Sequence, residues 1–260
     1  MFSAVSFSRW RYVGVSDVDV TVLALSKLVV HKARWLDLRS SLNISNVDEL
    51  MDRVLGDQSL LGKIRVLIEE RYRDVLADAH RITGMLKDDG VGFIPFYSPD
   101  YPRALREYRL RGSLYRPLVL YVKPPVSLDR RFVAVVGTRM CSKWGRRTAR
   151  KVGALIASYG YTLVTGLAEC IDVGAVEGAL ERGGLTVGVR PWLKPLNLPR
   201  KSREILERSE DKVVLTSEHY EKPPVSIKML YYLRNRIIAG MADLIVVVEA
   251  RPGGGSMHQI

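Results

Sequence analysis

Apolar and polar positions follow two different spacings along the chain, and the change between them falls near residue 88. Within residues 17–88, apolar side chains recur at every third or fourth position, which is the spacing of an amphipathic helix. One such pattern runs without interruption over residues 60–87, and Asp88-Asp89-Gly90 then provides a turn signal. Residues 1–88 are therefore predicted to form a small helical domain.

The rest of the chain has apolar runs of strand length. Two short runs lie at 91–96 and 118–122, and five further runs alternate with amphipathic helical patterns, at residues 131–137, 161–166, 185–189, 212–218 and 243–250. Near-continuous Val, Ile and Leu strands between such helices are typical of a parallel sheet covered on both faces. With right-handed crossovers, residues 89–260 are predicted to form an extended α/β domain with a doubly wound, mostly parallel Rossmann-like sheet.

Composition excludes several classes of protein. Apolar residues at 47% and charged residues at 26% of the 260 positions are typical of globular domains and exclude disorder. No apolar run is long enough to span a membrane, and the N-terminus lacks the clean apolar core of a signal peptide, so a cytoplasmic protein is expected. Cys141 and Cys170 are too few for a disulfide framework, and without CxxC or HExxH spacing we expect no metal and no other cofactor.

The positive charge is concentrated in the second half of the chain. Residues 129–260 contain 21 Lys and Arg against 13 Asp and Glu, whereas residues 1–128 contain 19 against 15. An excess of this kind is the electrostatic footprint of a polyanion binder. The charge alone does not distinguish a polyanion binder from a protein that is merely basic. The motifs have to distinguish these two alternatives.

Ligands of such folds bind beyond the carboxyl ends of the strands. The first loop there, Gly137-Thr138-Arg139, is predicted to hold phosphate, because glycine permits close approach and arginine offers a bidentate fork. Arg146 follows at the start of the next predicted helix, and the first backbone amides of such a helix are free to bind an anion. A tight turn with solvated arginines is the alternative. The absence of GxGxxG and GK[ST] motifs argues against dinucleotides and triphosphates.

Two further loops contain glycines at strand ends. Gly166 follows a predicted strand, and Asp172 beyond it is expected to cap the next helix rather than to act in catalysis. Gly255 and Ser256 close a run of three glycines, which could form a nest of amides for an anion or a flexible tail. Only ten residues follow the last predicted strand, so we expect the C-terminal end of the domain to be trimmed.

The predicted helix near residues 228–240 combines aromatic and cationic side chains at three- and four-residue spacing, namely Lys228, Tyr231, Arg234, Asn235 and Arg236. An aromatic ring flanked by cations suits single-stranded nucleic acid, since a base stacks on the ring for about 1–3 kcal/mol and the cations follow the phosphates. A core-facing tyrosine pair with surface arginines is the equally plausible alternative.

The ordered set of motifs resembles the DNA-processing protein A (Smf) family. It consists of GVGFIPFYSPDYPRALRE, VAVVGTR, WGRR, VTGLA followed by ID, a strand ending in TSE, RNRIIAG and a strand ending in VVEA. The resemblance covers residues 89–256, and the helical N-terminus takes the place of the family's small N-terminal domain.

The resemblance implies a recombination mediator rather than an enzyme. Members bind single-stranded DNA, dimerise and help to load a RecA-type recombinase in transformation or repair. Gly137, Thr138 and Arg139 match the family's phosphate loop, and Gly255-Ser256 match its Gly-Ser turn. The segment from Lys228 to Arg236 matches the K-x-x-F-x-x-R-N-R segment, with Tyr231 in place of the base-stacking Phe.

Two residues depart from the family's pattern. Glu169 replaces an arginine and Val176 replaces a histidine in the segment after the second strand of the alternating series. A carboxylate at the mouth of a DNA pocket repels phosphate, so Glu169 changes the expected path of the strand. The winged-helix domain of some members and the family's final helix and strand have no counterpart in this sequence.

An alternative within the same fold group is a nucleotide phosphoribohydrolase. Pro252 to Ser256 resemble the PGGxGT loop of the lysine-decarboxylase-like (lonely-guy) enzymes. Those enzymes place a catalytic glutamate shortly after the loop, and Met257 to Ile260 contain none. Hydrolysis therefore ranks below DNA binding, as does a nucleotide-sensing or purely structural module that would use the same phosphate loop.

Overall fold

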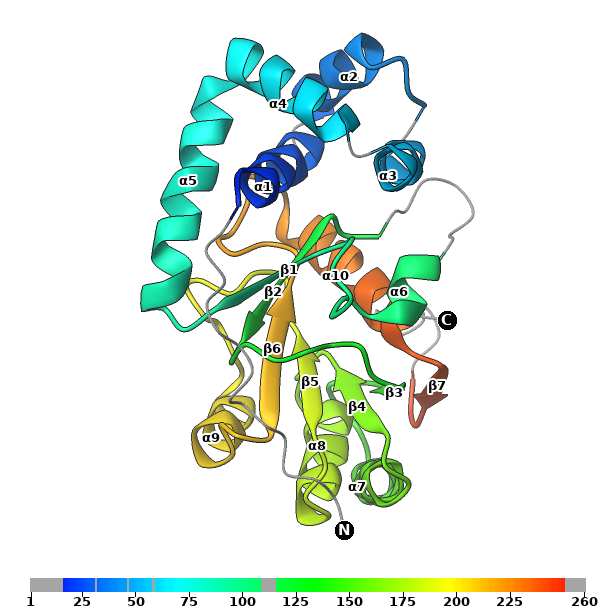
Figure 1. Ribbon diagram of the computed structural model, residues 1–260. Helices are drawn as coiled ribbons and strands as arrows, with labels where there is room; N and C mark the ends of the chain where they lie inside the picture. Colours follow the sequence, from blue (N-terminus) through cyan, green and yellow to red (C-terminus); the bar gives the residue numbers. More distant parts are fainter. Residues whose placement is uncertain (1–15, 31, 46, 58, 109–115, 251–260) are drawn as a thin grey trace.

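The computed structural model describes residues 16–250 except 31, 46, 58 and 109–115. Helices predominate up to residue 88, as the spacing of apolar residues predicts: α1 Asp17–Val30, α2 Lys32–Ser41, α3 Val47–Gly56, α4 Ser59–Arg71 and α5 Arg73–Asp88. These helices form a layer above one end of the sheet (Figure 1). The uninterrupted pattern over 60–87 is broken at Tyr72, which is buried and donates its hydroxyl to Asp37, so α4 and α5 pack in different directions.

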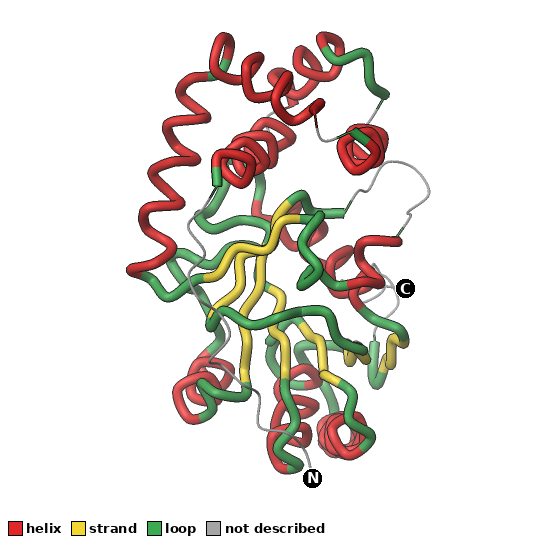
Figure 2. The backbone as a smooth tube through the Cα atoms, in the orientation of Figure 1, coloured by secondary structure: helices red, strands yellow, loops and turns green. Residues whose placement is uncertain are grey.

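Within the described residues, one sheet has the strand order β1-β2-β6-β5-β4-β3-β7 (Figures 1 and 2). Its strands are β1 Gly92–Pro95, β2 Val119–Lys123, β3 Phe132–Val136, β4 Thr162–Thr165, β5 Thr186–Val189, β6 Val213–Ser217 and β7 Leu244–Val247. The five strands from β3 to β7 are parallel to their neighbours in that series, and β1 and β2 add an antiparallel edge. The structure thus confirms the mostly parallel Rossmann-like sheet.

Helices connect the strands in the predicted alternation. They are α6 Arg103–Glu107, α7 Lys143–Ser158, α8 Ile171–Glu181, α9 Arg200–Arg208 and α10 Ile227–Met241. Strands β3 to β6 are buried at every position because helices cover both faces, which explains their near-continuous apolar sequences. Helix α10 runs along β3, β4 and β5, so its first turns reach the carboxyl ends of these strands.

The helical layer and the sheet share one hydrophobic core. Buried side chains from α1 to α5 belong to the same cluster as those of the strands. Polar links also join the two parts: the Tyr97 hydroxyl donates to Asp19 at 2.6 Å, and Arg81 forms an ion pair with Glu221 at 2.5 Å. The chain passes from α5 to β1 at the predicted boundary, yet packing continues across it.

The two cysteines, which are too few for a framework, form one disulfide between Cys141 and Cys170, with Cα atoms 5.8 Å apart. No described helix is long and apolar enough to cross a membrane. Likewise, no group of three or more metal-ligating side chains gathers within the described part of the chain.

Candidate nucleic-acid interface

A hollow of about 320 Å³ lies beyond the carboxyl ends of β3, β4 and β5. It is formed by the loops that follow these strands and by the first half of α10. Its lining consists of Arg139, Gly166, Leu167, Ala168, Glu169, Arg190, Asn197, Leu198, Pro199, Tyr231 and Arg234. The fold therefore brings four of the residues predicted from sequence, Arg139, Gly166, Tyr231 and Arg234, to one place.

Two arginines contact the ring of Tyr231 in this hollow. The guanidinium carbons of Arg139 and Arg234 each lie 5.5 Å from the centroid of its ring. Arg139 comes from an exposed loop, whereas Arg234 is buried one turn further along α10. The spacing of three residues on one helix explains the contact of Tyr231 with Arg234, and the crossing of α10 over β3 brings Arg139 to the same ring.

Arg234 is held by the loop that follows β4. A Cβ at Gly166 would lie 1.9 Å from an Nη atom of Arg234, so glycine is required there for the guanidinium to fit. The buried carboxylate of Asp172 accepts hydrogen bonds from the amides of Gly166 at 3.1 Å and Ala168 at 3.0 Å. Asp172 thus fixes the backbone of this loop. The capping role expected from the sequence is wrong, because Asp172 lies inside the first turn of α8, the helix begins after Cys170 without a side-chain cap, and the carboxylate is used by amides that precede the helix.

Arg190 is a lining residue that sequence reasoning missed. It follows β5 directly, is only 5% exposed, and donates to the carbonyl oxygens of Gly166 at 3.0 Å and of Asn197. A basic residue immediately after a buried strand, at the edge where ligands bind, was the signal that could have revealed it. Its guanidinium ties the loops after β4 and β5 together.

The pKa values of the two buried arginines that line the hollow, Arg190 and Arg234, are lowered. The pKa of Arg234 is lowered to about 10, chiefly by burial, with the neighbouring charges of Arg190 and Arg139 acting in the same direction and Asp172 opposing the shift. Burial also lowers the pKa of Arg190, against the effect of Tyr231, which hydrogen-bonds to it. Both directions reflect positive charge crowded into a poorly solvated site.

The loop after β3 uses many of its amides within the protein. The amide of Thr138 donates to the carbonyl of Glu249 at 2.7 Å, and that of Ser142 donates to the Glu249 carboxylate at 3.1 Å. At Gly137 a Cβ would lie 2.5 Å from Ile171, so the glycine serves close packing. The start of α7, predicted as an anion site, therefore lies against the carboxylate of Glu249. Side chains supply the positive charge of the hollow.

Other candidate residues lie away from the lining. Arg146 on α7 pairs with Glu177 of α8 at 2.8 Å, and Arg236, which is buried, pairs with Glu218 after β6. Asn235 is also buried. Lys228 is exposed in the first turn of α10, one turn before Tyr231. The predicted turn at Gly255 and Ser256 lies outside the described residues.

The disulfide joins the two loops that flank the hollow. Cys141 follows Arg139 by two residues, and Cys170 directly follows the lining residue Glu169. The Glu169 side chain is exposed. The carboxylate expected at the mouth of the site is therefore present there.

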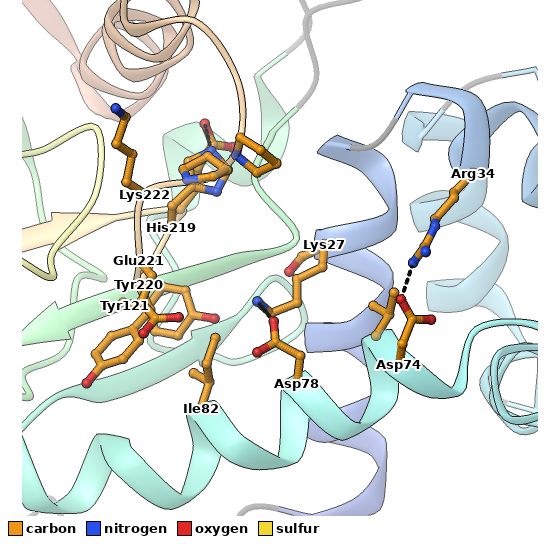
Figure 3. Close-up of a pocket in the computed structure, with 15 residues that line it drawn as sticks. Lys27, Arg34, Asp74, Asp78, Ile82, Tyr121, His219, Tyr220, Glu221 and Lys222 are labelled. Carbon is orange, nitrogen blue, oxygen red and sulfur yellow. Dashed lines mark hydrogen bonds and ion pairs between the residues drawn. The ribbon is translucent and has the colours of Figure 1, made fainter.

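A second hollow, of about 430 Å³, lies between α1, α5 and the segment that follows β6 (Figure 3). Its charged side chains largely pair with one another: Lys27 with Asp78, and Arg34 with Asp74 at 2.7 Å. Its lining contains both acidic and basic residues, including Glu218 and Glu221. Because its charges are mixed, this hollow suits a polyanion less well than the one beside Tyr231.

Comparison with known families gives a match over the α/β part of the chain. The family model described as DNA recombination-mediator protein A matches residues 92–260. The DNA processing protein DprA of Bacillus subtilis is 26% identical over 228 residues, covering 86% of this chain and 72% of that protein. DprA of Streptococcus pneumoniae is 33% identical over 218 residues, covering 82% and 72%. Protein Smf of Synechocystis is 34% identical, covering 80% of this chain and 48% of its own length.

Solved structures show the same relationship. The X-ray structure of DprA from Streptococcus pneumoniae superposes with a TM-score of 0.62 at 25% identity, covering 94% of this chain and 82% of that one. The structure of DNA processing protein A from Helicobacter pylori superposes with a TM-score of 0.52 at 24% identity. That structure was determined to explain how the Helicobacter pylori protein binds single-stranded DNA. The latter match covers 65% of this chain and is a likeness of fold.

Proposed function

The chain belongs to the DNA recombination-mediator protein A family, and from that premise we propose that it binds single-stranded DNA at the hollow beside Tyr231. The observation that carries the proposal is the convergence of Arg139, Arg190 and Arg234 on one tyrosine at the carboxyl edge of the sheet. An aromatic ring among guanidinium groups is the arrangement that holds a base and its phosphate together. Single-stranded DNA is also the ligand named for the Helicobacter pylori relative.

In this proposal a DNA base replaces the guanidinium group of Arg139 on the ring of Tyr231. Arg139 is exposed and contacts the Tyr231 ring through its guanidinium group. A base that stacks on the ring displaces Arg139, which then turns to a phosphate of the same strand. Arg234 is buried against Gly166 and stays in place beneath the ring. Lys228, one helical turn away, holds a neighbouring phosphate.

The contacts invoked are with phosphates and with the face of a base. Neither depends on which base is present, so binding has little sequence preference. Each phosphate contact releases counterions from the DNA, so the affinity falls steeply as the salt concentration rises.

The experiment is a titration of the protein with an oligo-dT of about 20 nucleotides at about 50 mM and 200 mM salt. Arg139→Ala and Lys228→Ala are each expected to weaken binding and to reduce the salt slope. Arg73→Ala and Lys63→Ala remove the same charges from exposed positions of α5 and α4 and serve as matched controls. Equal affinity of all four variants and the wild type contradicts the proposal.

We further propose that the chain acts as a binding protein rather than an enzyme, forms a homodimer and delivers DNA to a RecA-type recombinase. The family's description as a DNA recombination mediator supports delivery of DNA, and the other two statements are carried over from the resemblance of the sequence to that family. Light scattering tests the homodimer, because it measures the molar mass of the purified protein, and the mass of two chains is expected. Filament formation by a RecA-type recombinase on DNA coated with single-stranded-DNA-binding protein measures delivery, and an unchanged rate on addition of this protein contradicts it. Release of adenine from AMP would favour the phosphoribohydrolase alternative.

A further inference from the structure

Two arginines of the hollow are buried, and the part of the chain that the structure describes offers them no ion pair. Arg190 and Arg234 are each 5% exposed, and within the described ranges neither forms an ion pair with an acidic side chain. Arg236, 4% exposed on the same helix as Arg234, is paired with Glu218. A buried guanidinium without a carboxylate partner is costly unless an anion reaches it. The buried Asp172 attracts Arg234, but its carboxylate is used by the amides of Gly166 and Ala168. The contrast with Arg236 indicates that the two lining arginines can take an anionic ligand.

The anion site is organised in advance. Arg190 donates to the carbonyl oxygens of Gly166 and Asn197, and Arg234 is confined by Gly166. The guanidinium groups are therefore held in place before a ligand arrives, and no ordering of flexible side chains opposes binding at these two positions. The lowered pKa values of both groups agree with positive charge that is not fully compensated.

The number and placement of charges favour a phosphate with three free oxygens. Three guanidinium forks surround the hollow, whereas a phosphate inside a DNA strand has only two non-bridging oxygens. The exposed carboxylate of Glu169 lies at the same hollow, where it repels a further phosphate of a strand that continues past the site. A volume of about 320 Å³ accommodates one nucleotide-sized group.

Building on the proposed function, we propose that the hollow is a phosphate-monoester site. It takes the phosphate of a nucleotide whose base stacks on Tyr231, with Arg139, Arg190 and Arg234 around the three oxygens. The nucleotide is the phosphorylated end of a single strand or a free nucleoside monophosphate, and both present the same chemical group. The protein therefore recognises strand ends in addition to strand interiors.

The test compares three oligo-dT strands of about 20 nucleotides that carry a 5′-phosphate, a 3′-phosphate or hydroxyl groups at both ends. A fluorophore on an internal base leaves both ends free, and anisotropy gives each Kd. One of the phosphorylated strands is expected to bind about tenfold more tightly than the hydroxyl strand. The preference should shrink between about pH 7.5 and pH 5.5, because the monoester takes up its second proton near pH 6.

Variants and competitors complete the experiment. Arg190→Lys keeps the charge but not the fork, so the ratio between the Kd of the hydroxyl strand and the Kd of the preferred phosphorylated strand should fall towards one, whatever happens to the absolute affinities. The pH dependence of the wild type tests the same point if that variant does not fold. Competition by dTMP but not by thymidine identifies a free mononucleotide as a second source of the group.

The outcomes separate this inference from the proposed function. Equal Kd values for the three strands at both pH values overturn the monoester site, even if Tyr231→Ala abolishes binding of them all and so supports DNA binding at the hollow. A preference that is the same at both pH values also overturns it, because a dianion is then not what is recognised. Failure of every strand to bind rejects the proposed function itself.

Discussion

Gly166 and the guanidinium of Arg234 are in such close contact that a Cβ at residue 166 would lie 1.9 Å from an Nη atom. Gly166→Ala should therefore push Arg234 away from Tyr231 and weaken binding of oligo-dT by about tenfold. The measurement is the Kd together with the urea midpoint of unfolding. Gly84→Ala is the control, because nothing lies within 4 Å of that position in α5. This control should stabilise by about 0.5–1 kcal/mol without changing the Kd.

Tyr231 and Tyr232 provide a matched pair of neighbouring aromatic residues. Tyr231→Ala removes the ring that Arg139 and Arg234 contact, and should cost about 1–3 kcal/mol of DNA binding. Tyr231→Phe keeps the face of the ring and should retain most of the affinity. Tyr232→Ala, at an exposed position that does not line the hollow, should bind as the wild type does. If Tyr232→Ala loses binding and Tyr231→Ala does not, then Tyr231 is not the residue on which the base stacks.

The Cys141–Cys170 disulfide closes a loop across a sequence separation of 29 and ties together the loops that carry Arg139 and Glu169. On the chain-entropy model, its loss in Cys141→Ser should lower the free energy of unfolding by up to about 3–4 kcal/mol. The affinity for DNA should also fall, because Arg139 is then held less firmly. Thermal melts and titrations of the wild type with and without dithiothreitol provide the same comparison. A reductant effect that persists in Cys141→Ser would come from elsewhere.

His219 predicts how stability depends on pH. Burial lowers its pKa, Glu218 opposes that shift, and Arg236 and Lys27 reinforce it. The folded protein therefore binds this proton less readily than the unfolded chain does. The free energy of unfolding should fall as the pH drops below about 6.5, with a slope of up to about 1.4 kcal/mol per pH unit from this group. Denaturant titrations between pH 7 and pH 5 should show a shallower slope in His219→Gln, and an unchanged slope would contradict the assignment.

Glu249 holds Ser142, the N-cap residue of α7, from a distant part of the chain. Its carboxylate accepts from the amide of Ser142 at 3.1 Å and from the Ser142 hydroxyl at 2.9 Å. Glu249→Gln should destabilise the fold by about 1 kcal/mol, as loss of a helix cap does. Denaturant unfolding measures the change, with Glu207→Gln at an exposed position of α9 as the control. Equal stability of the two variants would show that the cap contributes nothing.

Strands and loops of the α/β part could be predicted because their signals are local. Buried parallel strands need continuous apolar runs, and the residues after each run are placed at one edge of the sheet by topology. Arg139, Tyr231 and Arg234 are brought together for this reason. The break at Tyr72 could not be predicted from periodicity, because α4 and α5 both bury apolar faces and the pattern continues across it.

Pairing of charges was the least predictable feature. Arg234 and Arg236 are two residues apart and look alike in the sequence, yet one contacts Tyr231 and the other pairs with Glu218. Residues two apart on a helix point in nearly opposite directions, so their partners depend on what packs on each side. Arg146 likewise finds Glu177 on a neighbouring helix.

By itself, the sequence determined the order of strands and helices, the edge of the sheet at which we propose that DNA binds, and the family, since each depends on local patterns and short motifs. Tertiary structure alone decided which cations face the hollow. It added Arg190, joined Cys141 to Cys170 and placed Glu249 at the start of α7. These relationships join segments far apart in the chain, and only the packing of loops against one another determines which of them meet.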